Sequence, residues 1–271
     1  MLSWCAYCQE FQGDLLPFDT LAVTHGICEA CAETALTLTD RELHHARALQ
    51  RIQAGLSDEG QQNDLSAAAR VLDEAMAAQI RAVDVLLGIV APMLCQIGED
   101  WRRAVVTVAQ EHRFAAFCQE VVTLVESRLH ADADAKRVAA GPVEALLMNA
   151  PGNRHTLGIH VLRLWLLAKG LHGRVLAPSP RAEEVAALVQ DLQPRLLLIS
   201  MAMAEHAPVA QVIVERIRAL PGPSRTRIIA GGNAVKQGQV ASIPGVELVP
   251  DIHALPTMLA AWAREAPRTA G

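Results

Sequence analysis

The stretch EALLMNAPGNRHTLGIHVLRLWLLAK (Glu144–Lys169) decides the fold of the second half of the chain. It begins with a short apolar run, Glu144–Asn149, which predicts a buried strand. It ends with a helical stretch, Leu157–Lys169, and the connecting loop contains the sequence NRHTLG (Asn153–Gly158). A strand that passes through a short loop into a helix is typical of an α/β unit.

Further alternation follows this unit. We expect strands at Arg174–Ala177, Arg195–Ser200, Arg227–Ala230 and Val246–Val249, and helices at Arg181–Asp191, Pro208–Leu220 and His253–Arg264. The pattern predicts a five-stranded, parallel, doubly wound sheet of the flavodoxin or Rossmann type over residues 142–271. Ligands of such sheets bind at the carboxyl ends of the strands, where the NRHTLG loop, Ser200 and Gly231–Gly232 all fall. A response-regulator-like domain with a loop histidine is the alternative.

Residues 37–131 have the pattern of four amphipathic helices joined by short turns, which predicts a four-helix bundle. On its fourth helix we expect one apolar face that runs from Val108 through Cys118 to Leu129, and we expect Cys95 and Cys118 in the core. Local signals predict capping boxes at Thr39–Glu42 and Thr107–Gln110, a turn at Gly55–Asn63, a kink at Pro92 and a linker at Ala131–Pro142.

Residues 1–36 hold two C-x-x-C pairs, Cys5 with Cys8 and Cys28 with Cys31. Two such pairs predict a tetrahedral zinc site, because each turn directs two thiolates at one ion. Four thiolates leave no open position, so we expect a structural role. Redox pairs or unrelated thiols are the alternative. This cysteine module (residues 1–36) is too small to fold without a metal or a neighbour.

Composition narrows the classes of function. The chain has 271 residues, 51% of them hydrophobic, and a net charge of −5 without a run of Lys and Arg. This argues against direct binding of nucleic acid. The longest apolar run, Val85–Cys95, is too short to span a bilayer, and no export signal is visible. We therefore expect a cytoplasmic protein that does not bind membranes.

The spacing of His155, Ser200 and the Gly231–Gly232 pair resembles the cobalamin (vitamin B12) signature. That signature joins an acid-x-His-x-x-Gly loop to a distant Ser-x-Leu and a Gly-Gly. The resemblance implies the following roles: His155 as the lower axial ligand of cobalt, Gly158 as the helix start that admits the nucleotide tail, Ser200 as the hydrogen-bond partner of the benzimidazole, and Gly231 and Gly232 as side-chain-free space for the tail. Asn153 stands where the family has an acid, and Ala202 where it has leucine.

A second motif, Trp101 followed by nine residues and Glu111–His112, resembles cobalamin-dependent photoreceptors of the CarH and LitR type. Those proteins set a helical bundle over the upper corrin face. The resemblance implies that Trp101 covers the upper axial group, that Glu111 contacts an adenosyl ligand and that His112 lies beside it. Arg102 departs from the family's histidine. The alternative is that Trp101 ends a helix and packs in the core.

Together, the resemblance covers roughly residues 60–268 and lacks the family's DNA-binding winged helix. It implies a cobalamin-dependent sensor that binds adenosylcobalamin or hydroxocobalamin. This sensor would respond to light and regulate a partner protein or transcription factor. We expect no enzymatic activity, and a homo-oligomer is compatible with this function. A corrinoid carrier of a methyltransferase system is the main alternative, and a cobalamin store or chaperone is a third.

Overall fold

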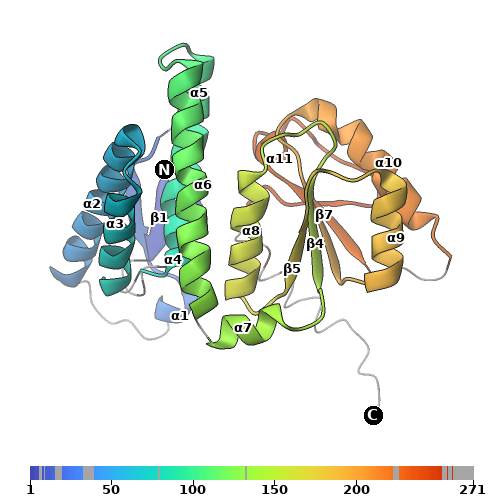
Figure 1. Cartoon of the computed structure of the whole chain (residues 1–271), viewed down its shortest axis with the longest axis horizontal. Coiled ribbons are helices and arrows are strands. Elements are labelled where there is room, and N and C mark those ends of the chain that lie inside the picture. The colour runs from blue at the N-terminus through green and yellow to red at the C-terminus, as the bar shows by residue number, and fades with distance from the viewer. Residues whose placement is uncertain are drawn as a thin grey trace. The chain divides into compact units, whose positions relative to one another are not determined.

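The computed structural model describes residues 1–5, 8, 10–15, 20–32, 40–78, 80–131, 133–221, 226–251, 255 and 258. It contains two compact units, Met1–Lys136 and Arg137–Gly271 (Figure 1). The boundary lies inside the expected linker, but part of that linker is the helix α7 (Ala133–Ala139). Ala, Lys and Arg in this segment favour a helix, which explains the difference.

The first unit begins with a three-stranded sheet of β1 (Leu2–Cys5), β2 (Phe11–Asp14) and β3 (Val23–Gly26), followed by α1 (Glu29–Ala32). The strand order is β2-β1-β3, with β1 antiparallel to β2 and parallel to β3. Trp4 and Phe11 are buried. The cysteine module therefore belongs to the same compact unit as the helices.

Four helices complete this unit and confirm the predicted bundle (Figure 1). They are α2 (Asp40–Gln62), α3 (Leu65–Ala77), a continuous helix over Ala82–Arg102, and α6 (Val108–Ala131). The continuous helix consists of α4 (Ala82–Val85), the π-helical segment η1 (Leu86–Val90) and α5 (Ala91–Arg102). The capping box at Thr107 is present, since its backbone N–H donates to Gln110 Oε1 over 2.8 Å.

The helix Ala82–Arg102 is long and apolar enough to cross a membrane when only length and composition are considered. However, 56% of its most apolar window is buried inside the protein, and core helices often meet the same criterion. The π-helical segment of this helix lies about one turn before Pro92. Pro92 has no N–H to donate to the carbonyl four residues earlier, and the π-helical turn at Leu86–Val90 lies at that point.

The turn predicted at Gly55–Asn63 is wrong, because α2 continues to Gln62 and the chain turns at Asn63 with a φ of 59°. Gly60 lies within α2, where its lack of a side chain allows close packing. A Cβ atom on Gly60 would lie 2.5 Å from Phe114 Cε2 and 3.0 Å from Phe117 Cδ1. The missing side chain thus lets two phenylalanine rings of α6 pack directly against α2.

The buried face of α6 differs from the predicted one at its start. Val108 is exposed, whereas the buried residues are Phe114, Phe117, Cys118, Val121, Val122 and Val125. Cys118 is in the core as expected, and burial raises the pKa of its thiol to about 12. Cys95 is exposed, so its predicted core position is wrong.

The second unit is a parallel five-stranded sheet in the order β5-β4-β6-β7-β8. Its strands are β4 (Ala145–Asn149), β5 (Gly173–Leu176), β6 (Leu196–Ser200), β7 (Arg227–Gly231) and β8 (Glu247–Leu248). Its helices are α8 (Leu157–Ala168), α9 (Ala182–Leu192), the short 3₁₀ helix η2 (Ala204–His206), α10 (Ala207–Arg218) and α11 (Asn233–Lys236). The flavodoxin-like order confirms the predicted fold class.

Helices cover both faces of this sheet (Figure 1). α9 and α10 pack on one face, where Leu146, Met148, Leu197 and Ile199 share their core. α8 covers the other face, and Leu147 and Leu166 both lie close to Gly173 there. This alternation along the strands is what a parallel sheet buried on both sides requires. Apart from Leu255 and Met258, the helix predicted at His253–Arg264 lies outside the described residues.

We predict that Gly60→Ala lowers the free energy of unfolding of the first unit by about 1–3 kcal/mol, because the added methyl group overpacks the α2–α6 contact. Urea unfolding followed by circular dichroism measures the change. The matched control is Gly98→Ala on α5, where an added Cβ meets no atom within 4 Å. Equal stability of the two variants would contradict the packing role of Gly60.

Candidate functional site

The carboxyl ends of three neighbouring strands meet at one edge of the parallel sheet. Strand pairing places Asn149 of β4 beside Ser200 of β6, and Ser200 beside Gly231 of β7. The loop that follows β4 carries Asn153 and His155, and α8 begins directly after it. The structure therefore brings the motif residues of the second unit to the same edge.

Asn153 ties this loop to the neighbouring strand. Its side chain is buried, and its Nδ2 donates to the Ser200 carbonyl oxygen over 3.1 Å. Its Oδ1 accepts a hydrogen bond of 3.1 Å from the His155 backbone N–H. A third bond, from Ala150 N to the same Ser200 oxygen over 2.9 Å, fixes the start of the loop. The backbone of His155 is thus held while its side chain is exposed.

These bonds explain why an amide suits position 153. Asn153 donates through one atom and accepts through the other, whereas an ionised carboxylate only accepts. An ionised aspartate here would face the Ser200 carbonyl oxygen without a proton to donate. The amide is therefore matched to the local backbone, independently of any ligand that His155 binds.

The three glycines of the motif have different surroundings. Gly158 is exposed, and a Cβ atom there would meet no atom within 4 Å. At Gly231 a Cβ would lie 2.9 Å from the Val249 carbonyl oxygen, and at Gly232 it would lie 2.5 Å from the Met201 carbonyl oxygen. Gly232 also has a φ of +100°, which favours glycine. The chain's own backbone accounts for Gly231 and Gly232, while Gly158 borders open space.

Sequence reasoning missed two buried polar residues under the loop. Asn149 Nδ2 donates to the Asn153 carbonyl oxygen over 3.2 Å, while its Oδ1 is buried with no hydrogen-bond partner among the described residues. His206 is buried, and its Nδ1 accepts a bond of 3.2 Å from Met203 N. A polar residue at the end of the apolar run Ala145–Asn149 was the available signal for the first of them.

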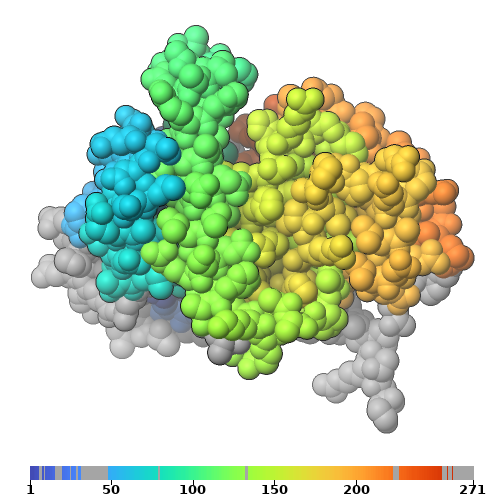
Figure 2. Space-filling view, viewed as in Figure 1, coloured from blue at the N-terminus to red at the C-terminus, as the bar shows by residue number. Residues whose placement is uncertain are grey.

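Trp101, Glu111 and His112 belong to the first unit, at the end of α5 and the start of α6. Trp101 is 48% exposed, so the alternative that it packs in the core is wrong. Val105 and Val108 are exposed as well. Figure 2 shows that this end of the two helices (green) extends beyond α2 and α3 (blue). An exposed apolar patch of this kind is typical of a binding surface.

The polar residues of this patch have defined partners. The distance between His112 Nε2 and Glu111 Oε2 is 3.4 Å. Arg102 is paired with Glu99, with 2.8 Å between its Nη2 and the Glu99 Oε1. Hydrogen bonding from Arg102 lowers the pKa of the Glu99 carboxyl group, so this carboxylate stays charged beside the patch.

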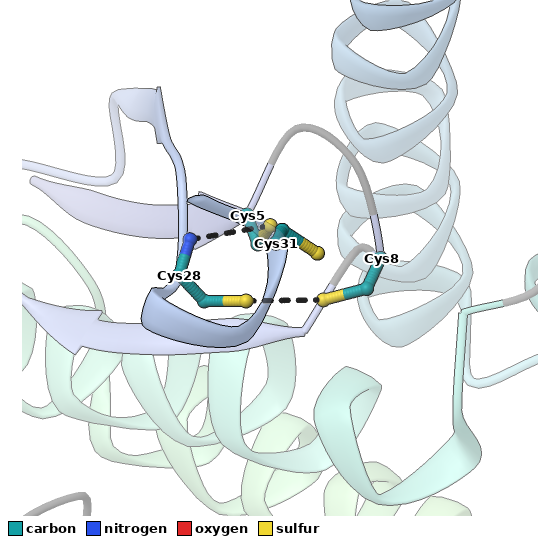
Figure 3. Close-up of side chains that lie close together, drawn as sticks. All are labelled: Cys5, Cys8, Cys28 and Cys31. Carbon is teal, nitrogen blue, oxygen red and sulfur yellow. Dashed lines mark hydrogen bonds between the residues drawn. The ribbon is translucent and has the colours of Figure 1, made fainter. Parts of the chain in front are cut away.

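The four cysteines of the N-terminal pairs form one cluster, as predicted (Figure 3). Their Sγ atoms all lie within 4.8 Å of one another, and those of Cys8 and Cys28 are 3.7 Å apart. Four sulfurs on one Zn²⁺ at the usual bond length lie about 3.8 Å apart, so the cluster fits a tetrahedral ion. The Cys28 N–H points at Cys5 Sγ over 3.5 Å.

Pairing of β1 with β3 produces this cluster, because Cys5 lies beside Gly26, two residues before Cys28. Burial raises the pKa of the Cys8 thiol, and hydrogen bonding to Cys28 raises that of Cys31. Without a cation the thiols of Cys8 and Cys31 therefore resist ionisation. A divalent cation would reverse this effect, because metals bind the thiolate form.

Comparison with known proteins identifies related sequences. Residues 53–126 match the family model described as "B12 binding domain". The HTH-type transcriptional repressor CarH of Myxococcus xanthus is 33% identical over 154 residues, which make up 56% of this chain and 48% of CarH. The chain thus spans about half the length of that curated relative. The matched B12 segment includes Trp101, Glu111 and His112.

Solved structures show where the fold recurs. The monomethylamine corrinoid protein of Methanosarcina barkeri aligns with a TM-score of 0.64 and 18% identity, over 79% of this chain and 99% of that chain. The methanol:cobalamin methyltransferase complex MtaBC of the same organism aligns with a TM-score of 0.41 and 17% identity, over 88% of this chain and 93% of that chain. The first alignment shows that this chain and the monomethylamine corrinoid protein have similar folds.

We predict that Asn153→Asp lowers the free energy of unfolding of the second unit at pH 7 by about 1–3 kcal/mol, because the Ser200 carbonyl loses a hydrogen-bond donor. Asn233→Asp, at an exposed position after β7, is the matched control. Urea unfolding monitored by tryptophan fluorescence measures both variants. An Asn153→Asp variant as stable as the control would show that the bond to Ser200 contributes nothing.

Proposed function

We propose that this protein is a cobalamin-dependent regulator in which the state of the cofactor changes contacts with a partner protein or transcription factor. The observation that carries the proposal is the exposed Trp101 with Glu111–His112 inside the segment that matches the B12 binding domain. A core tryptophan would have removed the main reason to assign these residues to a ligand.

Residues of each unit have a part in binding the cofactor. His155 is proposed as the lower ligand of cobalt, because its imidazole is exposed in a loop whose backbone Asn153 holds. Gly158 borders open space suited to the nucleotide tail, and Ser200 ends the adjacent strand. Gly231 and Gly232 are proposed to leave the end of the neighbouring strand free of side chains, as space for that tail. Trp101, Glu111 and His112 are proposed to contact the upper axial group.

When bound, cobalamin supplies an exchangeable upper axial ligand, whose identity differs between cofactor forms. The protein's contribution is to fix the backbone of His155, which leaves its imidazole exposed, and to present an apolar surface at Trp101. Because a ligand shifts a conformational equilibrium only through differential contacts, the patch around Trp101 is the expected origin of a signal. We propose adenosylcobalamin as the sensing form and light as the input, with hydroxocobalamin as the alternative form.

Relatives distinguish the regulator from the carrier only in part. The regulator is favoured by the 33% identity to CarH, a transcriptional repressor by name. A corrinoid carrier is the second candidate, since the structural neighbour at a TM-score of 0.64 is a corrinoid protein for monomethylamine. Neither function requires this chain to be an enzyme by itself. A regulator also requires a protein partner, and a second copy of the chain is compatible with it.

The proposal includes one Zn²⁺ on Cys5, Cys8, Cys28 and Cys31, supported by the mutual spacing of their sulfurs. Four thiolate ligands give a closed, structural site. We also propose a cytoplasmic location, because reduced cysteine pairs of this kind are typical of reducing compartments.

We predict that His155→Ala weakens cobalamin binding at least tenfold and shifts the visible spectrum, because the proposed lower ligand is lost. Titration of hydroxocobalamin into the full chain, followed by absorption, measures both effects. His172→Ala is the matched control, since His172 precedes β5 at the opposite edge of the sheet and its Nδ1 lies 2.7 Å from the Gly141 carbonyl oxygen. A spectrum that is unchanged in His155→Ala would remove His155 from the cobalt.

We predict that adenosylcobalamin-loaded protein changes its spectrum and its elution volume under green light. His112→Ala is expected to alter the spectrum of the illuminated form only. The control is His130→Ala at the other end of α6, where His130 Nδ1 lies 3.9 Å from Glu126 Oε1. A light-insensitive protein that accepts a methyl group from a methyl donor would support the carrier and contradict the sensor. Identical spectra in His112→Ala and wild type would remove His112 from the upper face.

A further inference from the structure

The three-stranded cysteine sheet packs its apolar face onto the helix Ala82–Arg102. Trp4 is fully buried and Phe11 nearly so, with their ring centroids 5.3 Å apart. A Cβ atom on Gly88 would overlap the Trp4 ring and would lie 2.8 Å from Phe11 Cδ2. The absence of a side chain at Gly88 therefore creates the space into which the indole of Trp4 fits.

This contact lies at the π-helical segment. Gly88 is the central residue of η1, and all five residues of η1 are buried. A π-helical turn widens a helix locally, so it is the position at which a bulky ring can be accommodated. Trp4 directly precedes the metal-ligating Cys5 in β1. The metal site and the ring that fits against the helix are thus adjacent in one strand.

A second link joins the cysteine turn to the same helix. Arg81 Nη2 lies 2.9 Å from Glu10 Oε1, two residues after Cys8, and Arg81 Nε lies 2.6 Å from Asp84 Oδ2. Asp84 is buried. Burial of the guanidinium opposes its charge, but hydrogen bonds and charges from Asp84 and Glu10 raise the pKa of Arg81 above its ordinary value. The guanidinium of Arg81 therefore stays charged at physiological pH.

We propose that Zn²⁺ at Cys5, Cys8, Cys28 and Cys31 is part of the fold of the helical unit, because it holds Trp4 against Gly88 and thereby sets the π-helical segment of the helix that carries Trp101. The inference rests on the zinc site proposed above and is independent of cobalamin. On binding, each thiol loses its proton to solvent as its sulfur bonds to the metal.

The small size of the sheet makes it depend on support from outside, which the helix and the proposed metal supply together. Its three strands have four residues each, which is too little chain to form a core of its own. When the metal is lost, no ion joins the four cysteines, so the strands lose their crosslink. Trp4 and Phe11 would then leave the surface of η1 and expose apolar residues of the bundle to water. Metal loss or thiol oxidation is therefore transmitted to the helix that carries Trp101.

The matched pair Gly88→Ala and Gly98→Ala tests this coupling in the full chain. Both substitutions replace glycine with alanine on the same continuous helix, but an added Cβ meets Trp4 only at position 88 and open space at position 98. Zinc affinity is measured under reducing conditions by competition with a chromogenic chelator. Stability is measured by urea unfolding of the zinc-loaded and zinc-free forms.

We expect about one zinc per chain in wild type and Gly98→Ala, and at least a tenfold loss of zinc affinity in Gly88→Ala. Removal of zinc is expected to lower the urea midpoint of wild type but to change that of Gly88→Ala much less. If Gly88→Ala does not fold, Trp4→Phe serves as the second variant, since a smaller ring weakens the same contact without adding atoms to the helix.

The outcomes separate the two levels of the proposal. A wild-type chain that binds no zinc, or whose cysteines form disulfides under reducing conditions, would overturn the zinc site itself. Zinc binding with wild-type affinity in both Gly88→Ala and Trp4→Phe would overturn only the coupling to the helix. Neither result bears on cobalamin, whose binding is measured separately through His155.

Discussion

Parallel pairing of β4, β6 and β7 is the constraint on which the candidate site depends. In a parallel sheet all carboxyl ends meet at one edge, so Asn149, Ser200 and Gly231 become neighbours although they are far apart in the sequence. The hydrogen bonds of Asn153 then fix the loop to the Ser200 carbonyl group. His155 is positioned by backbone contacts, which leaves its imidazole available for a ligand.

In the helical unit, packing depends on two glycines that aromatic rings approach closely. Gly60 admits two phenylalanine rings between α2 and α6, and Gly88 admits the Trp4 ring against η1. At each glycine an aromatic ring occupies the space that the methyl group of an alanine would take. The ring buries more apolar area than that methyl group would. The small helical unit and the cysteine sheet therefore share one core. This shared core is why residues 1–36 are better understood as part of the bundle than as an appended module.

Much of the fold could be predicted because its signals are local. Short apolar runs such as Leu196–Ser200 define buried strands, and their alternation with helices defines a parallel sheet. The segment GLSDEGQQN (Gly55–Asn63) has the composition of a turn, but it is helical up to Gln62, and Gly60 packs against Phe114 of a helix that is distant in the sequence. The partners of Asn153 likewise depend on where the loop passes β6. Such contacts are set by tertiary packing, which one sequence does not display.

Fold similarity alone does not separate a regulator from a methyl carrier, because one fold supports several functions. Under the proposed function, the region that would discriminate between them is the surface formed by the end of α5 and the start of α6. A carrier must present its cofactor to an enzyme, and a bulky residue above the cobalt would hinder that access. A sensor instead gains from a residue that contacts the upper ligand, because contacts that differ between cofactor states produce the conformational shift. The exposed Trp101, which lies in the same matched segment as Glu111 and His112, suits the second requirement.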